Sequence, residues 1–315
     1  MNDNVVLAID TSNYTTSVAI MSEDFELIAN LKRPLKVKAG ERGLRQSDAL
    51  FLHTVNLPEL IMEAGALLRD KNIVAVGVSE KPRSVEGSYM PCFLAGVSSA
   101  VSISATLGVP LYKFSHQDGH IMAALYSSNS MELADGEFAA FHVSGGTTEL
   151  VRVKAKNGAF TAECIGGTLD LNAGQLIDRI GVYMGLAFPA GAELEKLALK
   201  NTDKVPKKRV STDGLGMNLS GIENVATDMY KKTNNAPLVA AFVLDAVGRG
   251  LLSIRDSYLE QYGETDFVYA GGVMCNSVIK GMLSNERAHF ALPEMSADNA
   301  VGVAALALRK YISEK

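Results

Sequence analysis

The stretch VVLAIDTSNYTTSVAIM, residues 5–21, decides the fold. Two apolar, β-branched runs flank a turn rich in hydroxyl groups, a pattern that predicts a strand, a tight turn and a return strand. A similar pattern recurs in FAAFHVSGGTTELVRV, residues 138–153. Two hairpins with small, hydroxyl-bearing tips predict a duplicated fold, in which backbone N–H groups and hydroxyls can converge on phosphate oxygens from opposite sides.

The rest of the chain alternates between strand and helix patterns, which is typical of an α/β protein. Further strands are predicted at Ile73–Val78, Pro110–Phe114 and Asp266–Ala270. Helices are predicted at Ala49–Ala66, Met90–Leu107, Thr168–Met184, Ala190–Lys200, Pro237–Ser257, Asn276–Leu283 and Asn299–Glu314. The polar segment Ser127–Glu137 predicts a boundary between a first lobe, residues 1–127, and a second lobe, residues 138–315, whose last helix can pack back on the first.

Composition and charge are those of an ordinary soluble protein. The chain has 315 residues, 47% of them hydrophobic, and can bury a large core in two lobes. Its 30 Lys and Arg residues against 35 Asp and Glu residues give a net charge of −5, which argues against strong autonomous nucleic-acid binding. The basic run KVPKKR, residues 204–209, is interpreted as a solvated loop or, alternatively, as a phosphate contact.

The cysteines and the apolar segments indicate a cytoplasmic protein with no membrane contact. The three cysteines are far apart and odd in number, which favours reduced thiols over disulfides. The chain opens on a strand-like run, not on a basic and then apolar signal. The uncharged segment 87–112 raises the question of membrane insertion, but its hydroxyls and two prolines favour a buried core helix.

Two histidines four residues apart, His116 and His120, stand in FSHQDGH, residues 114–120. On a helix, side chains at this spacing share one face, so both imidazoles can reach one metal ion. Alternatively, both are partly buried or surface histidines that bind no ligand.

With six further motifs, this pair resembles the TsaD family of tRNA threonylcarbamoyladenosine synthases, long mislabelled O-sialoglycoprotein endopeptidases. The motifs follow the family's order over nearly the whole chain: HQDGH at 116–120, VSGGTTEL at 143–150, TLD at 168–170 with Asp178, GLAFPAG at 185–191, LSGI at 219–222, AGGV at 270–273 with Asn276, and Asp298-Asn299. The resemblance implies the two-lobed fold of actin, the sugar kinases and the heat-shock ATPases (ASKHA), with duplicated ribonuclease-H-like lobes.

The resemblance also implies a metal centre. His116, His120 and Asp298 would hold one divalent ion, iron(II) or zinc, and leave coordination positions open for substrate oxygens. Asp298 is then expected from the return segment of the second lobe, so that the ion sits in the cleft and neutralises phosphate or carbamate charge. As an alternative, Asp298 caps the last helix.

ATP or an acyl-adenylate is the nucleotide ligand that the resemblance implies. Residues at five consecutive positions would line the acyl-adenylate site: His142, Val143, Ser144, Gly145 and Gly146. Asp178 would bind the ribose hydroxyls, Gly191 would permit close backbone approach, Asn276 would read the adenosine, and Glu195 stands where some members have Asp. Alternatively, Asp178 is a surface acid and Asn276 a helix cap.

The first hairpin departs from the family's pattern. The family reads Glu-Thr-Ser-Cys-Asp-Glu-Thr where this chain reads DTSNYTT, residues 10–16, so Tyr14 and Thr15 replace two acids. A carboxylate can deprotonate an amine nucleophile, whereas a phenol or hydroxyl does so poorly at neutral pH. No catalytic residue is therefore assigned.

Three functions compete. The first is an enzyme that transfers threonylcarbamoyl from threonylcarbamoyl-AMP to an adenosine of tRNA, in a complex with a TsaB-like protein partner. The second is a non-catalytic, nucleotide- and metal-binding paralogue or regulatory subunit, which the altered hairpin favours. The third is phosphotransfer with Asp10 as the catalytic carboxylate. Proteolysis is disfavoured because Gln117 cannot act as the general base of a zinc protease.

Overall fold

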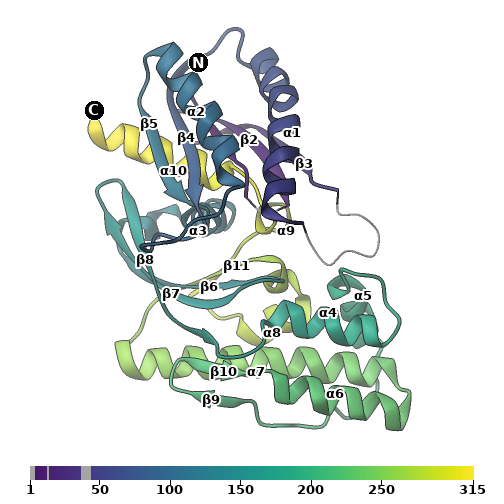
Figure 1. Ribbon diagram of the computed structural model, residues 1–315. Helices are drawn as coiled ribbons and strands as arrows, with labels where there is room; N and C mark the ends of the chain where they lie inside the picture. The colour runs from purple at the N-terminus through teal and green to yellow at the C-terminus, as the bar shows by residue number, and fades with distance from the viewer. Residues whose placement is uncertain (1–3, 13, 37–43) are drawn as a thin grey trace. The chain divides into compact units, whose positions relative to one another are not determined.

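The structure, a computed structural model, describes residues 4–12, 14–36 and 44–315 (Figure 1). Asn13, which belongs to the first predicted turn, lies outside the described residues. The chain forms two compact units, each made of more than one segment. Unit 1 comprises Met1–Gly136, Lys154–Ala162 and Ala297–Lys315, and unit 2 comprises Glu137–Val153 and Glu163–Ser296.

Unit 1 is built on a five-stranded sheet in the order β3-β2-β1-β4-β5. Its strands are β1 (Asn4–Asp10), β2 (Thr15–Ser22), β3 (Leu27–Pro34), β4 (Asn72–Lys81) and β5 (Leu111–Ser115). The predicted first hairpin is present, with β1 antiparallel to β2, while β1, β4 and β5 run parallel. Nearly all of β1 is buried because it is the central strand, which explains its uninterrupted apolar sequence.

Helical segments also belong to unit 1. They are α1 (Gln46–Leu67), α2 (Phe93–Leu107), α3 (His116–Ser127), the short 3₁₀ helix η1 (Met131–Asp135) and α10 (Val301–Glu314). The C-terminal helix α10, yellow in Figure 1, packs against α3 and against strands β1 and β4. The first half of α10 is entirely buried, which accounts for its run of small apolar residues.

Glycines permit the close contact of α10 with α3. A Cβ at Gly302 would overlap the carbonyl oxygen of Gly119 and lie 2.6 Å from the Ala123 nitrogen. A Cβ at Gly119 would lie 3.1 Å from Val303 Cγ2. The two backbones therefore meet directly, and this contact fixes the position of the residues that precede α10.

Unit 2 is built on a seven-stranded sheet in the order β12-β11-β6-β7-β8-β10-β9. Its strands are β6 (Glu137–Val143), β7 (Thr148–Lys156), β8 (Ala159–Thr168), β9 (Ser211–Asp213), β10 (Gly216–Asn218), β11 (Phe267–Ala270) and β12 (Ala288–Phe290). The end of β7 and the start of β8, within Lys154–Ala162, belong to unit 1. Five of the strands of this sheet, in the order β8-β7-β6-β11-β12, repeat the order of the sheet in unit 1, and β6, β11 and β12 are again parallel. The predicted duplication is therefore confirmed in the strand topology.

The helical segments of unit 2 are α4 (Ala173–Tyr183), α5 (Gly191–Ala198), α6 (Ser220–Thr233), α7 (Ala236–Tyr262), η2 (Gly272–Cys275), α8 (Ser277–Leu283) and α9 (Pro293–Ser296). Among the described residues one helix, α7, is long and apolar enough to cross a membrane by length and composition alone. However, 61% of its most apolar window is buried, and its residues Phe242, Val243 and Leu251 belong to the core of unit 2. A core helix passes the same test.

One predicted helix begins later than expected, and other elements were missed. The helix expected from Thr168 starts at Ala173, because Thr168 ends β8 and pairs with Met217 of β10. Neither α6 nor the small β9–β10 hairpin was predicted, since both are short or carry many polar residues. Strands β3, β8 and β12 and the short helices η1, η2 and α9 were not predicted either. The remaining helices and strands lie within a few residues of their predicted positions.

The α3–α10 contact can be tested by adding one methyl group. We expect Gly302→Ala to destabilise the protein by about 1–3 kcal/mol, because the new Cβ must push the two backbones apart. Gly65→Ala in α1 is the matched control: its Cβ would meet nothing within 4 Å, so it should stabilise the helix by about 0.5–1 kcal/mol. Urea unfolding measures both, and equal stability of the two variants would contradict the close contact.

Candidate functional site

The histidine pair lies in the first turns of α3, whose start is fixed by local hydrogen bonds. Ser115 Oγ accepts from the Asp118 nitrogen at 3.1 Å, and Asp118 Oδ2 accepts from the Ser115 nitrogen at 3.1 Å. This reciprocal capping box starts the helix at His116. His116 and His120 consequently occupy one face, as the spacing predicted.

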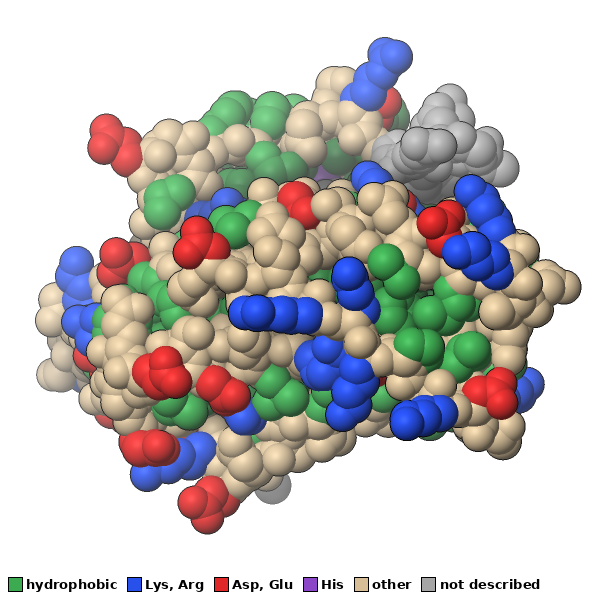
Figure 2. Space-filling model, turned by 90° about the horizontal axis from the view of Figure 1, so that it is seen from below, with side chains coloured by type: hydrophobic (Ala, Val, Ile, Leu, Met, Phe, Trp, Pro, Cys, Tyr) green, Lys and Arg blue, Asp and Glu red, His purple; other side chains and the backbone are tan. Residues whose placement is uncertain are grey.

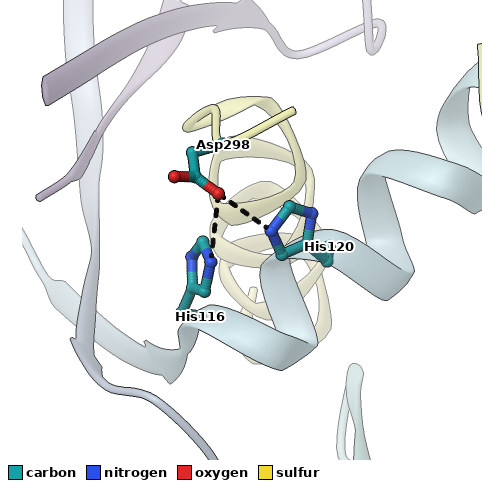
Figure 3. A group of neighbouring side chains, drawn as sticks. All are labelled: His116, His120 and Asp298. Atoms are coloured by element: carbon teal, nitrogen blue, oxygen red, sulfur yellow. Dashed lines mark ion pairs between the residues drawn. The ribbon is translucent and has the colours of Figure 1, made fainter. Parts of the chain in front are cut away.

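The Asp298 carboxylate lies close to both histidines (Figure 3). Its Oδ1 lies 3.5 Å from His116 Nε2 and 3.4 Å from His120 Nε2. One ligand atom from each of the three residues lies within 4.8 Å of the other two. Two ligands about 2.0–2.1 Å from one tetrahedral ion are about 3.3 Å apart. The spacing between the carboxylate and each imidazole therefore fits a shared metal ion.

All three residues belong to unit 1, whereas Asp298 was expected from the second lobe. The difference arises because α10 packs on α3 and brings the residues just before it to the histidines. Asp298 does not take its alternative role of capping the last helix, because the N-cap of α10 is Ala300 and no side chain caps it. The neighbouring Asn299 accepts a hydrogen bond from the Val301 nitrogen through Oδ1 at 3.0 Å. The Asp298 carboxylate faces the imidazoles instead.

A second carboxylate, missed in the sequence as part of this cluster, lies behind His116. Asp10 Oδ2 is 3.3 Å from His116 Nδ1 and accepts from Ser12 Oγ at 2.5 Å. The Asp10 side chain is fully buried, and its Oδ1 has no hydrogen-bond partner among the described residues. Histidines that bind metals commonly donate their other ring N–H to such a carboxylate, which directs the free nitrogen at the ion.

Parallel strands explain how Asp10 and His116 meet. Asp10 ends β1, and His116 directly follows β5, which runs in the same direction in the same sheet. The carboxyl ends of parallel strands lie at one edge of a sheet, so residues at these positions converge. The position of Asp10 at a strand end was the signal available in the sequence.

The charges of the cluster favour a cation between the carboxylates. Burial disfavours the charged imidazole of His116, but attraction to Asp10 and hydrogen bonds to Asp10 and Asp298 outweigh it and raise the pKa of His116 to about 10. Burial also disfavours the charged carboxylate of Asp298, but hydrogen bonds from His116 and His120 hold the pKa of Asp298 well below its usual range. Without a metal ion, His116 is therefore protonated at neutral pH, and its single positive charge offsets part of the negative charge of the two acids.

The threonine hydroxyls of the first hairpin form hydrogen bonds with other residues of unit 1. Thr11 Oγ1 donates to the Cys92 carbonyl oxygen at 3.0 Å and accepts from the Gly96 nitrogen at 3.1 Å. Thr16 Oγ1 lies 2.8 Å from His53 Nδ1. These bonds occupy hydroxyls that the sequence suggested for phosphate oxygens, while Tyr14, at the altered position, is 38% exposed.

In unit 2 the second hairpin turn is held tightly by its neighbours. His142 and Val143 end β6 and are buried, and the turn closes with a 2.8 Å bond from the Ser144 nitrogen to the Thr147 oxygen. A Cβ at Gly271, after β11, would overlap the Val143 oxygen, and a Cβ at Gly174, in α4, would lie 2.6 Å from Gly145 Cα. Gly145 and Gly146 remain exposed at the carboxyl end of β6.

Three other predicted nucleotide residues are Asp178 in α4, Glu195 in α5 and Asn276 at the start of α8. Asp178 Oδ1 accepts from the Ala190 nitrogen at 2.8 Å; burial raises the pKa of Asp178, and this hydrogen bond opposes the shift. Glu195 of α5 accepts from the Ser277 nitrogen at 2.8 Å. Asn276 Oδ1 caps α8 and accepts from Val278 N and Ile279 N, each at 3.1 Å. The cap role that the sequence left open for Asn276 is thus present.

Comparisons with known proteins agree with this fold and these motifs. In fold, the chain is similar to HypF of T. kodakarensis, with a TM-score of 0.66 and 14% identity over 98% of this chain and 48% of that one. It is also similar to the activator of the 2-hydroxyisocaproyl-CoA dehydratase from Clostridium difficile, with a TM-score of 0.56 and 14% identity over 98% of this chain and 96% of that one. These likenesses confirm the expected α/β, two-lobed ASKHA fold.

The sequence comparisons are more specific. A tRNA N6-adenosine threonylcarbamoyltransferase of Streptococcus suis (strain 05ZYH33) is 30% identical over 335 aligned positions, which cover 100% of this chain and 94% of the relative. The profile of the TsaD family, described as tRNA N6-adenosine threonylcarbamoyltransferase, matches residues 35–305. The chain therefore belongs to the TsaD family of transferases.

Proposed function

We propose that this protein is an acyltransferase that moves the threonylcarbamoyl group from threonylcarbamoyl-AMP to N6 of an adenosine in tRNA. The observation that carries the proposal is the cluster of His116, His120 and Asp298 in a member of the TsaD family. In the reaction a bond forms between N6 and the carbamoyl carbon, and the bond from that carbon to the phosphate oxygen breaks. N6 releases one proton to water, and AMP leaves.

We assign one divalent metal ion, iron(II) or zinc, to His116, His120 and Asp298. Two imidazoles and a carboxylate suit either ion, and the separations of 3.4 and 3.5 Å fit a shared ion. When bound, the ion would supply positive charge that stabilises the phosphate and carbamoyl oxygens. Asp10 would hold the His116 ring in place through Nδ1.

ATP or the acyl-adenylate is assigned to the turn Ser144–Gly146 and its neighbours in unit 2. A Cβ at Gly145 or Gly146 would meet nothing within 4 Å, and one at Gly191 would meet only Ile177 Cγ2 at 3.9 Å. Neither crowding nor a positive φ requires glycine at these three positions. Close approach of a ligand to the backbone is the reason we propose for them. Asp178 and Asn276 would contact the ribose and the adenine.

A protein partner is proposed for the outer face of α1 and α2 in unit 1. These helices pack together and leave large apolar side chains exposed, among them Phe51 at 67%, Met62 at 71% and Leu94 at 47%. Phe51 and Met62 are eleven residues apart, close to three helical turns, and therefore share one side of α1. Exposed apolar side chains that lie together indicate a protein-binding surface. We propose a TsaB-like protein there, and the cytoplasm as the location of the complex.

The proposal is tested by a transfer assay. We expect labelled threonine to enter tRNA when the protein is mixed with bicarbonate, ATP, an adenylate-forming enzyme and the partner proteins. His120→Gln should lower the rate about 100-fold or more, because several kcal/mol of charge stabilisation disappear with the ion. His289→Gln, at a histidine 2.8 Å from Asp266 in unit 2, is the control and should leave the rate unchanged. Nucleotide binding without any modified base would favour a non-catalytic regulatory subunit.

The role of Asp10 is tested by metal affinity. We expect Asp10→Asn to weaken zinc binding about 10–100-fold, because the amide orients the His116 ring less strongly than a carboxylate does. Asp24→Asn removes the same charge from an exposed position in the same unit and serves as the control. Competition with a chromophoric chelator measures both affinities, and equal values would remove Asp10 from the site.

The raised pKa of His116 predicts a dependence on pH. A metal ion must displace the proton from His116, whose pKa rises from the ordinary value of about 6.5 to about 10. We expect zinc affinity to increase about tenfold per pH unit between these values. The stability of the metal-free protein should change in the opposite direction: the contribution of protonated His116 is complete below pH 6.5 and is lost as the pH rises through about 10. Chelator competition and urea unfolding at pH 7, 8 and 9 check both trends, and a flat affinity would contradict them.

A further inference from the structure

The basic run at residues 204–209 plays no part in the sites described above. It lies in the irregular segment between α5 and β9 of unit 2. Its four cationic side chains, Lys204, Lys207, Lys208 and Arg209, are all exposed. In the part of the chain that the structure describes, none of the four pairs with a carboxylate, whereas Arg179 pairs with Glu223 and Arg249 with Asp245. The positive charge of the run is therefore available to a ligand.

Two of these side chains border a hollow. Lys208 and Arg209 line a cavity of about 390 Å³ together with Ser211 and Thr212 of β9, Asn218 of β10 and Gly221 of α6. The hydroxyls and the amide add uncharged hydrogen-bond donors to the two cations. Figure 2 views the side of unit 2 that carries α6, α7, β9 and β10, and several Lys and Arg side chains lie close together there. Cations and neutral donors around one hollow suit a phosphate group.

One backbone carbonyl of the run is held by a side chain of α7. Arg249 Nη1 donates to the Lys208 carbonyl oxygen at 2.6 Å, while Arg249 Nε donates to Asp245 Oδ2 at 2.8 Å. Upstream, Asn235 Nδ2 donates to Asp203 Oδ2 at 2.8 Å. Asp203 directly precedes the run, and Asp245 contacts the arginine that binds it. Both carboxylates thus accept hydrogen bonds from residues outside the run.

The beginning of α6 does not provide the anion site. The nitrogens of Leu219 and Ser220 donate to the Asp170 carboxylate at 2.7 and 3.1 Å. Burial favours the neutral form of Asp170, but hydrogen bonds from Ser220 and Leu219 outweigh it and lower the pKa of Asp170. This carboxylate is therefore charged at neutral pH and occupies the helix start. An anion in the hollow must be recognised by the side chains of Lys208 and Arg209.

We infer that Lys207, Lys208 and Arg209, with the hollow beside them, bind the phosphate backbone of RNA and anchor tRNA on unit 2. The identity of the RNA rests on the proposed function. A protein with a net charge of −5 needs a local positive surface to hold a polyanion, because long-range attraction is absent. Contacts with phosphates position the RNA without reading its sequence.

The salt dependence of RNA binding tests the inference. The full chain, with the partner proteins of the transfer assay, is titrated with an unmodified tRNA transcript and with a short double-stranded RNA at several salt concentrations. In Lys207→Gln/Lys208→Gln, the slope of log affinity against log salt should decrease by about 0.7–0.9 for each phosphate that the variant no longer neutralises. Binding at 0.1 M salt should then weaken about tenfold per phosphate. Both RNAs should be affected alike.

Lys231→Gln/Lys232→Gln is the matched control. It removes the same charge from exposed positions in the last turn of α6, about 15 Å along the helix from Gly221. We expect the affinity of this variant to stay within about twofold of the unchanged protein. An equal effect of both double variants would show general charge attraction and overturn the inference.

The outcomes separate the inference from the proposed function. If tRNA is modified but Lys207→Gln/Lys208→Gln binds RNA with unchanged affinity and slope, the inference is wrong and the proposed function stands. If RNA binding depends on Lys207 and Lys208 but no modified base forms, the inference stands and the proposed function fails. If the unchanged protein binds neither RNA, the inference is overturned.

Discussion

The direct contact of α10 with α3 is the constraint on which the candidate metal centre depends. Gly302 and Gly119 carry no side chains, so the two helix backbones meet without spacing. Asp298 stands three residues before α10 and is carried to within 3.4 Å of His120 as a result. A wider separation of the helices would move the Asp298 carboxylate away from both imidazoles. The small residues of α10 thus permit both the packing of the core and the position of Asp298.

The electrostatics of the cluster describe a site built around a positive charge. His116 lies between two carboxylates, Asp10 at 3.3 Å and Asp298 at 3.5 Å. Two acids close together repel each other unless a cation lies between them. In the metal-free protein the His116 proton supplies that charge, and a divalent ion would supply it more fully. The same carboxylates that hold the proton therefore favour the ion that replaces it.

Much of the fold and part of the site follow from local sequence. Alternating and apolar runs determine strands such as β1 and β6, and the capping residues Ser115 and Asp118 determine that His116 and His120 share a helical face. These features depend on residues within a few positions of one another. The start of α4 and the β9–β10 hairpin could not be predicted, because Thr168 takes its conformation from a strand that pairs with β10, far along the chain.

The sequence by itself thus determined the duplicated hairpins, the α/β class and the order of the family's motifs. Only the tertiary structure decided that Asp298 belongs to unit 1, that Asp10 lies behind His116, and that the basic run at 204–209 borders a hollow without carboxylate partners among the described residues. The physical reason is that hydrogen bonds within a turn or a helix depend on neighbouring residues. Packing of α10 on α3 and the pairing of charges depend on segments that meet only after the chain has folded.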